Sequence, residues 1–286
     1  MNRTIRTTLL AASATALLGV AWAQDLVMAT GAQPDTLDPQ VTSATSAFQT
    51  SKSIYDTLVE VAPDGLLEPL LARDWSVSED GTFEAFELVD ATFHDGTAFD
   101  ATDAVASLNR IRDADVSPKA DEFTAIEEIV AVDDDTVRLV LTRPAPALLA
   151  SLASGWGAIL PSEKLASGHD FGTQPVGTGP FTLDEWVRDS HLRLVANPDY
   201  FGGAPAVDTV TLRFVADSAV QLQGLLAGEF HVIGGVATAD LPTVEANDDV
   251  VLVQEPSGTV LVSSINTRRP FLDDARVRRA LNLAVD

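Results

Sequence analysis

The chain has 286 residues, of which 46% are hydrophobic, and a formal net charge of -24 at pH 7. This length and hydrophobic content are typical of a globular protein with one large domain or two small ones. The negative charge argues against nucleic acid and anionic lipid surfaces as partners, because both would be repelled.

The first 23 residues have the pattern of a secretory signal peptide. Arg3 and Arg6 precede an apolar run from Leu9 to Ala23, which ends in the cleavage pattern Ala21-Trp22-Ala23. The run is shorter than the roughly 20 apolar residues that a spanning helix needs, which favours a cleaved leader over a membrane anchor. The chain has no cysteine that could carry a lipid or form a disulfide. We therefore expect residues 1–23 to be removed and the product to be periplasmic, not a lipoprotein.

A strand and a helix are predicted first after the leader. A short apolar segment from Leu26 to Ala29 predicts the strand, and apolar residues near helical spacing predict a helix from Ser46 to Leu58. Farther along, the sequence predicts four strands, and one helix that Asp100 can cap: the strands are Asp74 to Val77, Thr82 to Leu88, Ile126 to Ala131 and Thr136 to Leu141, and the helix is Ala101 to Arg112. The run Asp133-Asp134-Asp135 predicts a hairpin turn.

After Pro175 the strands become longer and alternate with helices. The predicted strands are Phe181 to Val187, Leu192 to Ala196, Val207 to Val215, Phe230 to Ile233, Val250 to Gln254 and Val260 to Ile265. The predicted helices are Ser218 to Ala227, Ala239 to Ala246 and a closing helix that starts at Asp273 or Asp274. This alternation predicts an α/β fold.

No catalytic, metal or cofactor motif is found in the sequence. It contains no G-x-S-x-G, H-E-x-x-H or Walker pattern, and its four histidines lack the spacing of metal ligands. We interpret His94 as a hydrogen-bonded structural residue. Trp75 and Trp186 alternate within strands and are expected in the core. Trp156 lies between two glycines, and there ligand contact and a cleft wall are equally compatible with the sequence.

Three loops are candidates for ligand binding, because open α/β sheets bind ligands at the carboxyl ends of their strands. Ser43, Ala44, Thr45 and Ser46 lead into the first helix and offer hydroxyls and N-terminal amides to an anionic group. Gly234 and Gly235 follow the strand that ends at Ile233, and Ser257 with Thr259 forms the third candidate. The alternative for each hydroxyl is that it caps a helix or stabilises a turn.

Several motifs occur in a fixed order along the chain. Between Glu68 and Arg110 they are Leu71-Ala72 with Trp75-Ser76, Ser78-Glu79-Asp80-Gly81-Thr82, and Phe93-His94-Asp95-Gly96-Thr97 followed by Ala101, Asp103, Ser107 and Arg110. Later ones are Pro175 to Phe181, Asn197-Pro198-Asp199-Tyr200-Phe201, and Asn266 with Pro270 to Leu281. Together they resemble the signature of the family 5 extracellular solute-binding proteins, the peptide- and nickel-type receptors of ABC importers. Leu88-Val89 and His231 depart from the family's pattern.

The resemblance implies a two-lobed periplasmic-binding-protein-like α/β fold of class II, with an extra subdomain. Residues 24–63 and 176–262 would form the main subdomain of the first lobe, residues 64–175 an inserted subdomain, and residues 263–286 the start of a second lobe. The helix that runs to Asp286 has no residue that would end it. We therefore expect this sequence to be an N-terminal fragment in which most of the second lobe is missing.

The resemblance also implies a monomeric receptor that captures a small solute between two lobes and delivers it to the membrane subunits of an ABC permease. In similar proteins, positions matching the loop at 42–46 and the pair at 234–235 lie against the solute. A di- or oligopeptide is the leading solute, while nickel chelates, glutathione-like thiols, sugars and opines stay open. Two alternatives are a periplasmic ligand-sensing domain for a membrane receptor and a secreted hydrolase.

Overall fold

The computed structural model describes residues 25–254 and 264–284, and the chain separates into two compact units between Thr238 and Ala239. Strands and helices alternate along the first unit, which confirms the predicted α/β class. The predicted leader at 1–23 lies outside the described residues. The predicted subdomain boundaries at 63, 175 and 262 stay predictions.

One sheet of five strands contains the first strand of the described chain. Its order is β11-β1-β10-β9-β8, in which β1 is parallel to both β10 and β11, while β8 and β9 form an antiparallel hairpin. The bounds are β1 Asp25–Thr30, β8 Phe181–Val187, β9 His191–Ala196, β10 Thr209–Phe214 and β11 Val232–Ile233. The register pairs Thr30 with Phe214, and Ala29 with Ile233. The carboxyl ends of β1, β10 and β11 therefore share one edge of the sheet.

A second sheet is wholly antiparallel, with the order β4-β5-β7-β6. The bounds are β4 Ala72–Val77, β5 Phe83–Leu88, β6 Ile126–Asp133 and β7 Thr136–Leu141. Helix α2, Ala101–Ile111, follows β5, and the Asp100 carboxylate accepts hydrogen bonds from the backbone N–H groups of Thr102 and Asp103, which confirms the predicted cap. The turn predicted at Asp133-Asp134-Asp135 is also confirmed, because Asp133 pairs with Thr136 at the end of the β6–β7 hairpin.

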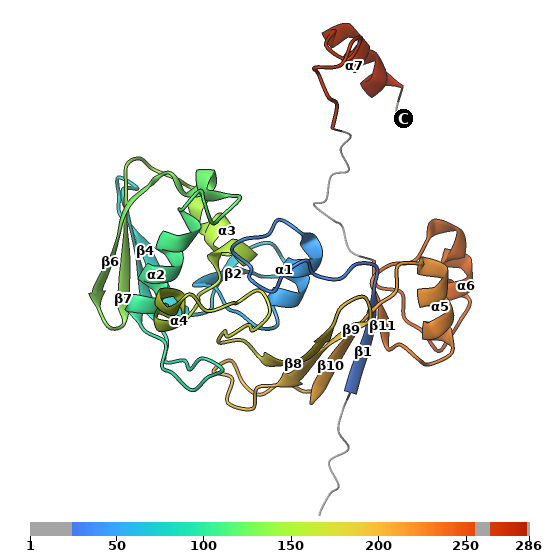
Figure 1. The fold of residues 1–286 in the computed structure, drawn as a ribbon, viewed down its shortest axis with the longest axis horizontal. Coiled ribbons are helices and arrows are strands. Elements are labelled where there is room, and N and C mark those ends of the chain that lie inside the picture. Colours follow the sequence, from blue (N-terminus) through green and yellow to red (C-terminus); the bar gives the residue numbers. More distant parts are fainter. Residues whose placement is uncertain (1–24, 255–263, 285–286) are drawn as a thin grey trace, which may run out of the picture. The chain divides into compact units, whose positions relative to one another are not determined.

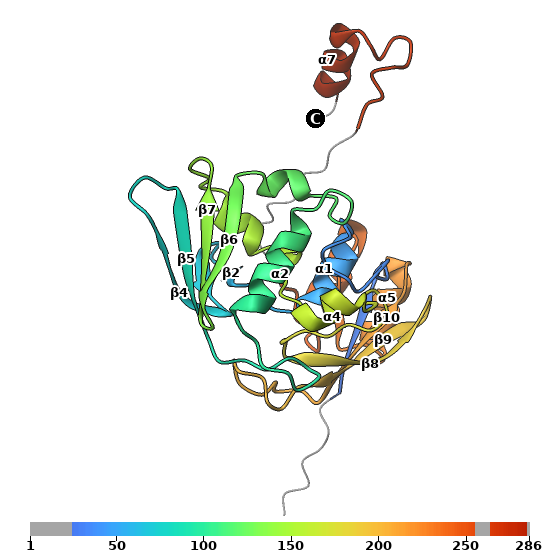
Figure 2. The same ribbon diagram turned by 60° about the vertical axis from the view of Figure 1, so that its left-hand side comes forward.

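The remaining elements are short. A small hairpin joins β2 Val59–Val61 to β3 Leu67–Pro69. The short helices of the first unit are α1 Thr45–Ser51, α3 Leu148–Leu152 and α4 Ser162–Ser167, and α5 Ser218–Leu226 lies close to its prediction. Single 3-10 turns cover Ala120–Phe123, Gly155–Gly157 and Thr238–Asp240. Figures 1 and 2 both show α1 between the two sheets.

The sequence predicted too long a first helix. Helix α1 ends at Ser51 instead of continuing to Leu58. The carbonyls of Ser53 and Ile54 accept hydrogen bonds from the backbone N–H groups of Phe181 and Gly179, at 2.9 Å each. These carbonyls bind a distant segment instead of a following helical turn.

The strand predicted from Val250 to Gln254 is wrong. The structure assigns no strand to residues 250–254, and Val251 and Val253 are 88% and 75% exposed. Alternating valines favour a strand, but a strand also needs a hydrogen-bonding partner, and none of the described strands pairs with this segment. The strand predicted from Val260 to Ile265 lies mostly outside the described residues.

Two separate apolar clusters fill the first unit. One lies between the second sheet and α2 and includes Phe86, Leu108 and Leu139. The other lies against the five-stranded sheet and includes Ile54, Leu192 and Leu194. Trp75 packs against the first cluster and Trp186 against the second, as predicted.

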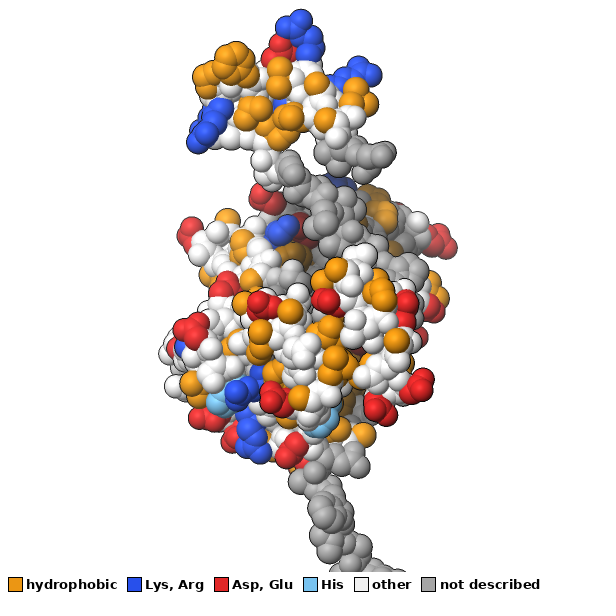
Figure 3. Space-filling view, turned by 90° about the vertical axis from the view of Figure 1, so that its right-hand side faces the viewer, with side chains coloured by type: hydrophobic (Ala, Val, Ile, Leu, Met, Phe, Trp, Pro, Cys, Tyr) orange, Lys and Arg blue, Asp and Glu red, His pale blue; other side chains and the backbone are white. Residues whose placement is uncertain are grey.

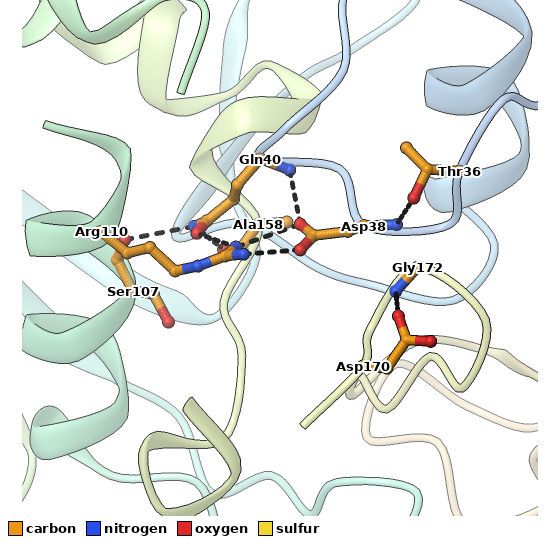
Figure 4. A network of polar contacts seen from close by, with 8 residues as sticks. All are labelled: Thr36, Asp38, Gln40, Ser107, Arg110, Ala158, Asp170 and Gly172. Atoms are coloured by element: carbon orange, nitrogen blue, oxygen red, sulfur yellow. Dashed lines mark hydrogen bonds and ion pairs between the residues drawn. The ribbon is translucent and has the colours of Figure 1, made fainter. Parts of the chain in front are cut away.

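A polar network joins α2 to the segment between β1 and α1 (Figure 4). Arg110 donates two hydrogen bonds to the Asp38 carboxylate, at 3.1 and 2.6 Å, and a third to the side-chain oxygen of Gln40 at 2.9 Å. Gln40 in turn donates to the carbonyls of Ser107 and Ala158. The Asp38 side chain is 8% exposed and that of Arg110 is 22% exposed. This bidentate ion pair is therefore largely shielded from water.

The second unit contains α6, Leu241–Glu245, and α7, Ala275–Leu283. The Asp274 carboxylate accepts a hydrogen bond from the Arg276 backbone N–H, so α7 starts where the sequence predicted. Phe271 is 81% exposed and Leu283 is 78% exposed. Figure 3 shows hydrophobic and basic side chains together on the segment that carries α7. None of the described helices is long and apolar enough to cross a membrane.

We predict that Arg110→Ala lowers the free energy of unfolding by about 3 to 5 kcal/mol, because Asp38 would be left buried and unpaired. Arg110→Lys should cost less, since it keeps the charge but loses the planar fork. Urea unfolding followed by tryptophan fluorescence measures both. Arg193→Ala is the control, because its ion pair with Asp184 is about 40% exposed on both sides and should contribute less than about 1 kcal/mol. Equal losses of unfolding free energy for Arg110→Ala and Arg193→Ala would contradict the conclusion that Arg110 neutralises a buried carboxylate.

Candidate functional site

The segment that leaves β1 and enters α1 is closed on itself by side-chain hydrogen bonds. The Ser46 hydroxyl donates to the Gln33 carbonyl at 2.9 Å, and the Thr42 hydroxyl donates to the Asp35 carboxylate at 2.9 and 3.0 Å. The Thr42 hydroxyl also accepts from the Ala44 backbone N–H at 3.0 Å. The residues from Thr42 to Ser46, which we call the hydroxyl loop, are thus held at the carboxyl end of β1.

The hydroxyl loop contains two kinds of hydroxyl: those that hydrogen-bond within the protein and those that do not. Thr42 and Ser46 stabilise the turn, as the alternative interpretation of these residues predicted. Ser43 and Thr45 are exposed, and their hydroxyls bond to nothing among the residues that the structure describes. Ala44, which precedes the first residue of α1, has an extended backbone. Ser43 and Thr45 are therefore the hydroxyls that a ligand can reach.

Trp156 contacts both the hydroxyl loop and the helix that follows it. Its indole N–H donates to the Thr42 carbonyl at 2.8 Å, and its ring meets Phe48 of α1 edge-on with 4.9 Å between ring centroids. The Lys119 ammonium lies 5.1 Å from the ring centroid, within range of a cation–π interaction. Gly155 has to be glycine, because a Cβ there would lie 2.2 Å from the Phe48 ring. Trp156 therefore stabilises the position of the hydroxyl loop. Its direct contact with a ligand stays a prediction.

Gly234 and Gly235 lie at the same sheet edge as the hydroxyl loop. The Gly234 N–H donates to the Ala29 carbonyl of β1 at 3.2 Å, and both glycines are exposed. A Cβ on Gly235 would meet no described atom within 4 Å, so internal packing does not explain this glycine. The structure thus brings Trp156 against the loop and places the glycine pair directly after the neighbouring strand β11. Ser257 and Thr259 lie outside the described residues.

A cavity of about 240 Å³ lies beyond the other end of α1, and the sequence did not predict it. Its walls include Lys52, Asp56, Ser154 and Tyr200. The Asp56 carboxylate accepts hydrogen bonds from the hydroxyls of Thr178 at 2.8 Å and Tyr200 at 3.3 Å. Burial raises the pKa of Asp56 to about 6, although these two hydrogen bonds act in the opposite direction. No sequence pattern connects three residues so far apart in the chain.

His94 is a structural residue, as predicted. Its Nε2 lies 2.9 Å from the Gly179 carbonyl, and its own backbone N–H donates to the Gly177 carbonyl at 2.8 Å. Burial lowers the pKa of His94, which favours the neutral ring. Within residues 25–254 and 264–284, no three His, Cys, Asp or Glu side chains gather as metal ligands would.

One arrangement bears on the hydrolase alternative. Ser190 Oγ lies 3.0 Å from His191 Nδ1, and His191 Nε2 lies 3.3 Å from the Glu185 carboxylate. These residue types match a serine hydrolase, but serine and histidine are adjacent on a hairpin whose Glu185 is exposed. The arrangement therefore gives little support to catalysis.

Comparison with known proteins identifies relatives of the chain. The family model described as bacterial extracellular solute-binding proteins, family 5 Middle, matches residues 67–286. The dipeptide-binding protein of Escherichia coli (strain K12) is 33% identical over 292 residues, which cover 92% of this chain and 54% of the relative. The chain spans about half the length of the curated relatives it matches.

Solved structures show the same fold. The periplasmic binding protein DppA from Helicobacter pylori, in complex with the peptide STSA, has a TM-score of 0.83 at 28% identity and covers 92% of this chain and 57% of its own. The binding protein MoaA from A. tumefaciens R10, in complex with mannopinic acid, has a TM-score of 0.83 at 32% identity and covers 93% of this chain and 56% of its own. Proteins with this fold thus hold different solutes.

We predict that Asp56→Asn removes a pH-dependent loss of stability. Because the pKa of Asp56 is higher in the folded state, the folded protein binds this proton more tightly, and stability falls as the pH rises from 3.8 to about 6. Between pH 4 and 7 the variant should gain about 2 kcal/mol relative to the wild type. Burial raises the pKa of Glu84 to about 7, and this residue is present in both the wild type and the Asp56→Asn variant. Its contribution to the pH dependence therefore cancels when their stabilities are subtracted. Urea unfolding at several pH values tests this, and a pH-independent difference would contradict it.

Proposed function

The chain belongs to the bacterial extracellular solute-binding proteins of family 5, and from this premise we propose that it is the solute-capturing first lobe of a periplasmic binding protein. The protein would act as a monomer that delivers its solute to the membrane subunits of an ABC importer. We propose a di- or oligopeptide as the solute. The names of its relatives, which include dipeptide-, di/tripeptide- and glutathione-binding proteins, support this solute class.

The observation that carries the proposal is the hydroxyl loop at the carboxyl ends of two parallel strands. Ser43 and Thr45 present free hydroxyls, and Gly234 and Gly235 present exposed backbone directly after the adjacent strand β11. Hydroxyls both donate and accept hydrogen bonds, which suits the alternating N–H and C=O groups of a peptide backbone. Side chains at the described part of the loop carry no charge. We therefore assign the backbone of the solute, and not its charged ends, to this surface.

In the proposed mechanism the solute bridges two lobes and shifts the balance between open and closed forms toward the closed form. The size of the shift is set by the solute's differential affinity for the two forms. This chain would supply one wall, with Trp156 holding the hydroxyl loop in place for the solute. The importer would then respond to the closed form. The same capture step would serve a sensory receptor, so stimulation of a reconstituted permease distinguishes transport from sensing.

We predict that Ser43→Ala combined with Thr45→Ala weakens peptide binding by the full-length gene product about 5- to 150-fold, because two hydrogen bonds of about 0.5 to 1.5 kcal/mol each would be lost. Calorimetric titration with dipeptides, tripeptides, glutathione and mannopinic acid measures this. Ser76→Ala is the control, since Ser76 is an exposed hydroxyl on β4 of the other sheet. Failure of the wild type to bind any peptide at millimolar concentration would refute the proposed solute class.

A further inference from the structure

We infer that the turn of residues 188–190 between β8 and β9 is a positioning element, which through Arg188 and Asp189 holds the hydroxyl loop in its solute-binding geometry. Neither residue is expected to touch the solute. This inference rests on the proposed function, because it concerns the same site.

Sheet topology brings this turn to the edge that carries the candidate site. Strand β9 runs antiparallel to β10, with His191 opposite Arg213, and the Phe214 N–H donates to the Ser190 carbonyl. Strand β1 runs parallel to β10, with Thr30 opposite Phe214. The β8–β9 turn therefore lies at the edge where β1 ends and where the segment toward α1 begins.

The first connection runs through Gln33. The Gln33 side-chain amide donates to the Asp189 carboxylate, and the Asp189 backbone N–H donates back to the Gln33 side-chain oxygen at 3.0 Å. The Gln33 carbonyl accepts the hydroxyl hydrogen bond of Ser46 at 2.9 Å. Asp189 thus fixes the residue to which one end of the hydroxyl loop is bonded.

The second connection runs through Asp35. Arg188 donates to the Asp35 carbonyl at 3.1 Å, and the Asp35 carboxylate accepts from the Thr42 hydroxyl. The Arg188 guanidinium lies 3.7 Å from the ring centroid of Trp186, which packs against the second apolar cluster. Arg188 thus contacts Trp186 at the second apolar cluster and also binds Asp35, the residue to which Thr42 at the other end of the hydroxyl loop is bonded.

The backbone of Asp189 supports a specific role. Its φ is 61°, and among the described residues other than glycine only Phe271 shares a positive φ. Aspartate and asparagine tolerate this left-handed conformation better than most residues, because their short side chains can hydrogen-bond locally. Glycine would fit this backbone without strain but could not accept a hydrogen bond from Gln33. The left-handed backbone and the hydrogen bond from Gln33 together explain why residue 189 is an aspartate.

The expected consequence is a loss of affinity without a matching loss of stability. These contacts are exposed, so each contributes little to folding. They order a loop that would otherwise have to be ordered when the solute binds, and that cost would then reduce affinity. A residue with a merely structural role would lower stability and affinity together.

The test uses the full-length gene product with Asp189→Gly, Arg188→Ala and the conservative variant Asp189→Asn. Asp184→Asn and Arg193→Ala are matched controls, because this ion pair lies on the same hairpin. Calorimetry with the tightest-binding peptide measures Kd, thermal unfolding measures Tm, and hydrogen exchange measures protection of residues 42–48. We expect Asp189→Gly and Arg188→Ala to raise Kd about three- to tenfold and to speed exchange in the loop. Tm should stay within about 2 °C, and Asp189→Asn should behave as the wild type.

Unchanged Kd and unchanged exchange in both variants would overturn the inference, as would equal effects in the controls or a fall in Tm that accounts for the weaker binding. If the wild type binds no peptide, the proposed solute is wrong, but the exchange measurement still decides the inference. Faster loop exchange in Asp189→Gly and not in Asp184→Asn supports the positioning role, and equal exchange in these two variants overturns it.

Discussion

The close approach of Gly177 and Gly179 to the carbonyl of Ile54 is the constraint on which the first unit depends. A Cβ on Gly177 would lie 2.1 Å from the Ile54 oxygen, and a Cβ on Gly179 would lie 2.5 Å from the Ile54 carbonyl carbon, so only glycine allows this contact. The contact joins the segment just after α1 to the segment just before β8, and His94, which follows β5 of the second sheet in the chain, binds the same glycine segment. One backbone contact thereby joins three parts of the unit.

A polar network lies close to both apolar clusters, and this has a consequence for the candidate site. The Arg110, Asp38 and Gln40 network links α2 to the segment that leads into the hydroxyl loop. A buried ion pair is weak evidence for net stability, because desolvation offsets much of the attraction. It does require a defined geometry, since each donor must face its acceptor. We infer that the network fixes where the segment lies more than it adds to stability.

The sequence predicted the features that local patterns determine. Alternating apolar residues located β5 and β7 within a residue or two, and Asp100 located the start of α2. Short helices such as α3 were not predicted, because five residues are too few to show a clear helical periodicity of apolar residues. Contacts such as Gln33 with Asp189, or Asp56 with Tyr200, could not be predicted, because distant pairing is set by topology and leaves no local pattern. The strand at 250–254 failed because valine alternation does not supply a partner strand.

The charge of the candidate site differs from that of the chain as a whole. Acidic side chains are scattered over the face in Figure 3, in line with the net charge of -24. At the hydroxyl loop the Asp35 carboxylate is engaged by Thr42, and Ser43 and Thr45 are neutral. A neutral hydrogen-bonding surface distinguishes poorly between solutes that differ only in their charged ends, because those differences are recognised by ion pairs. In the proposed function, solute selectivity would therefore depend mainly on residues outside the hydroxyl loop, whereas the loop would contribute to the affinity for any accepted solute.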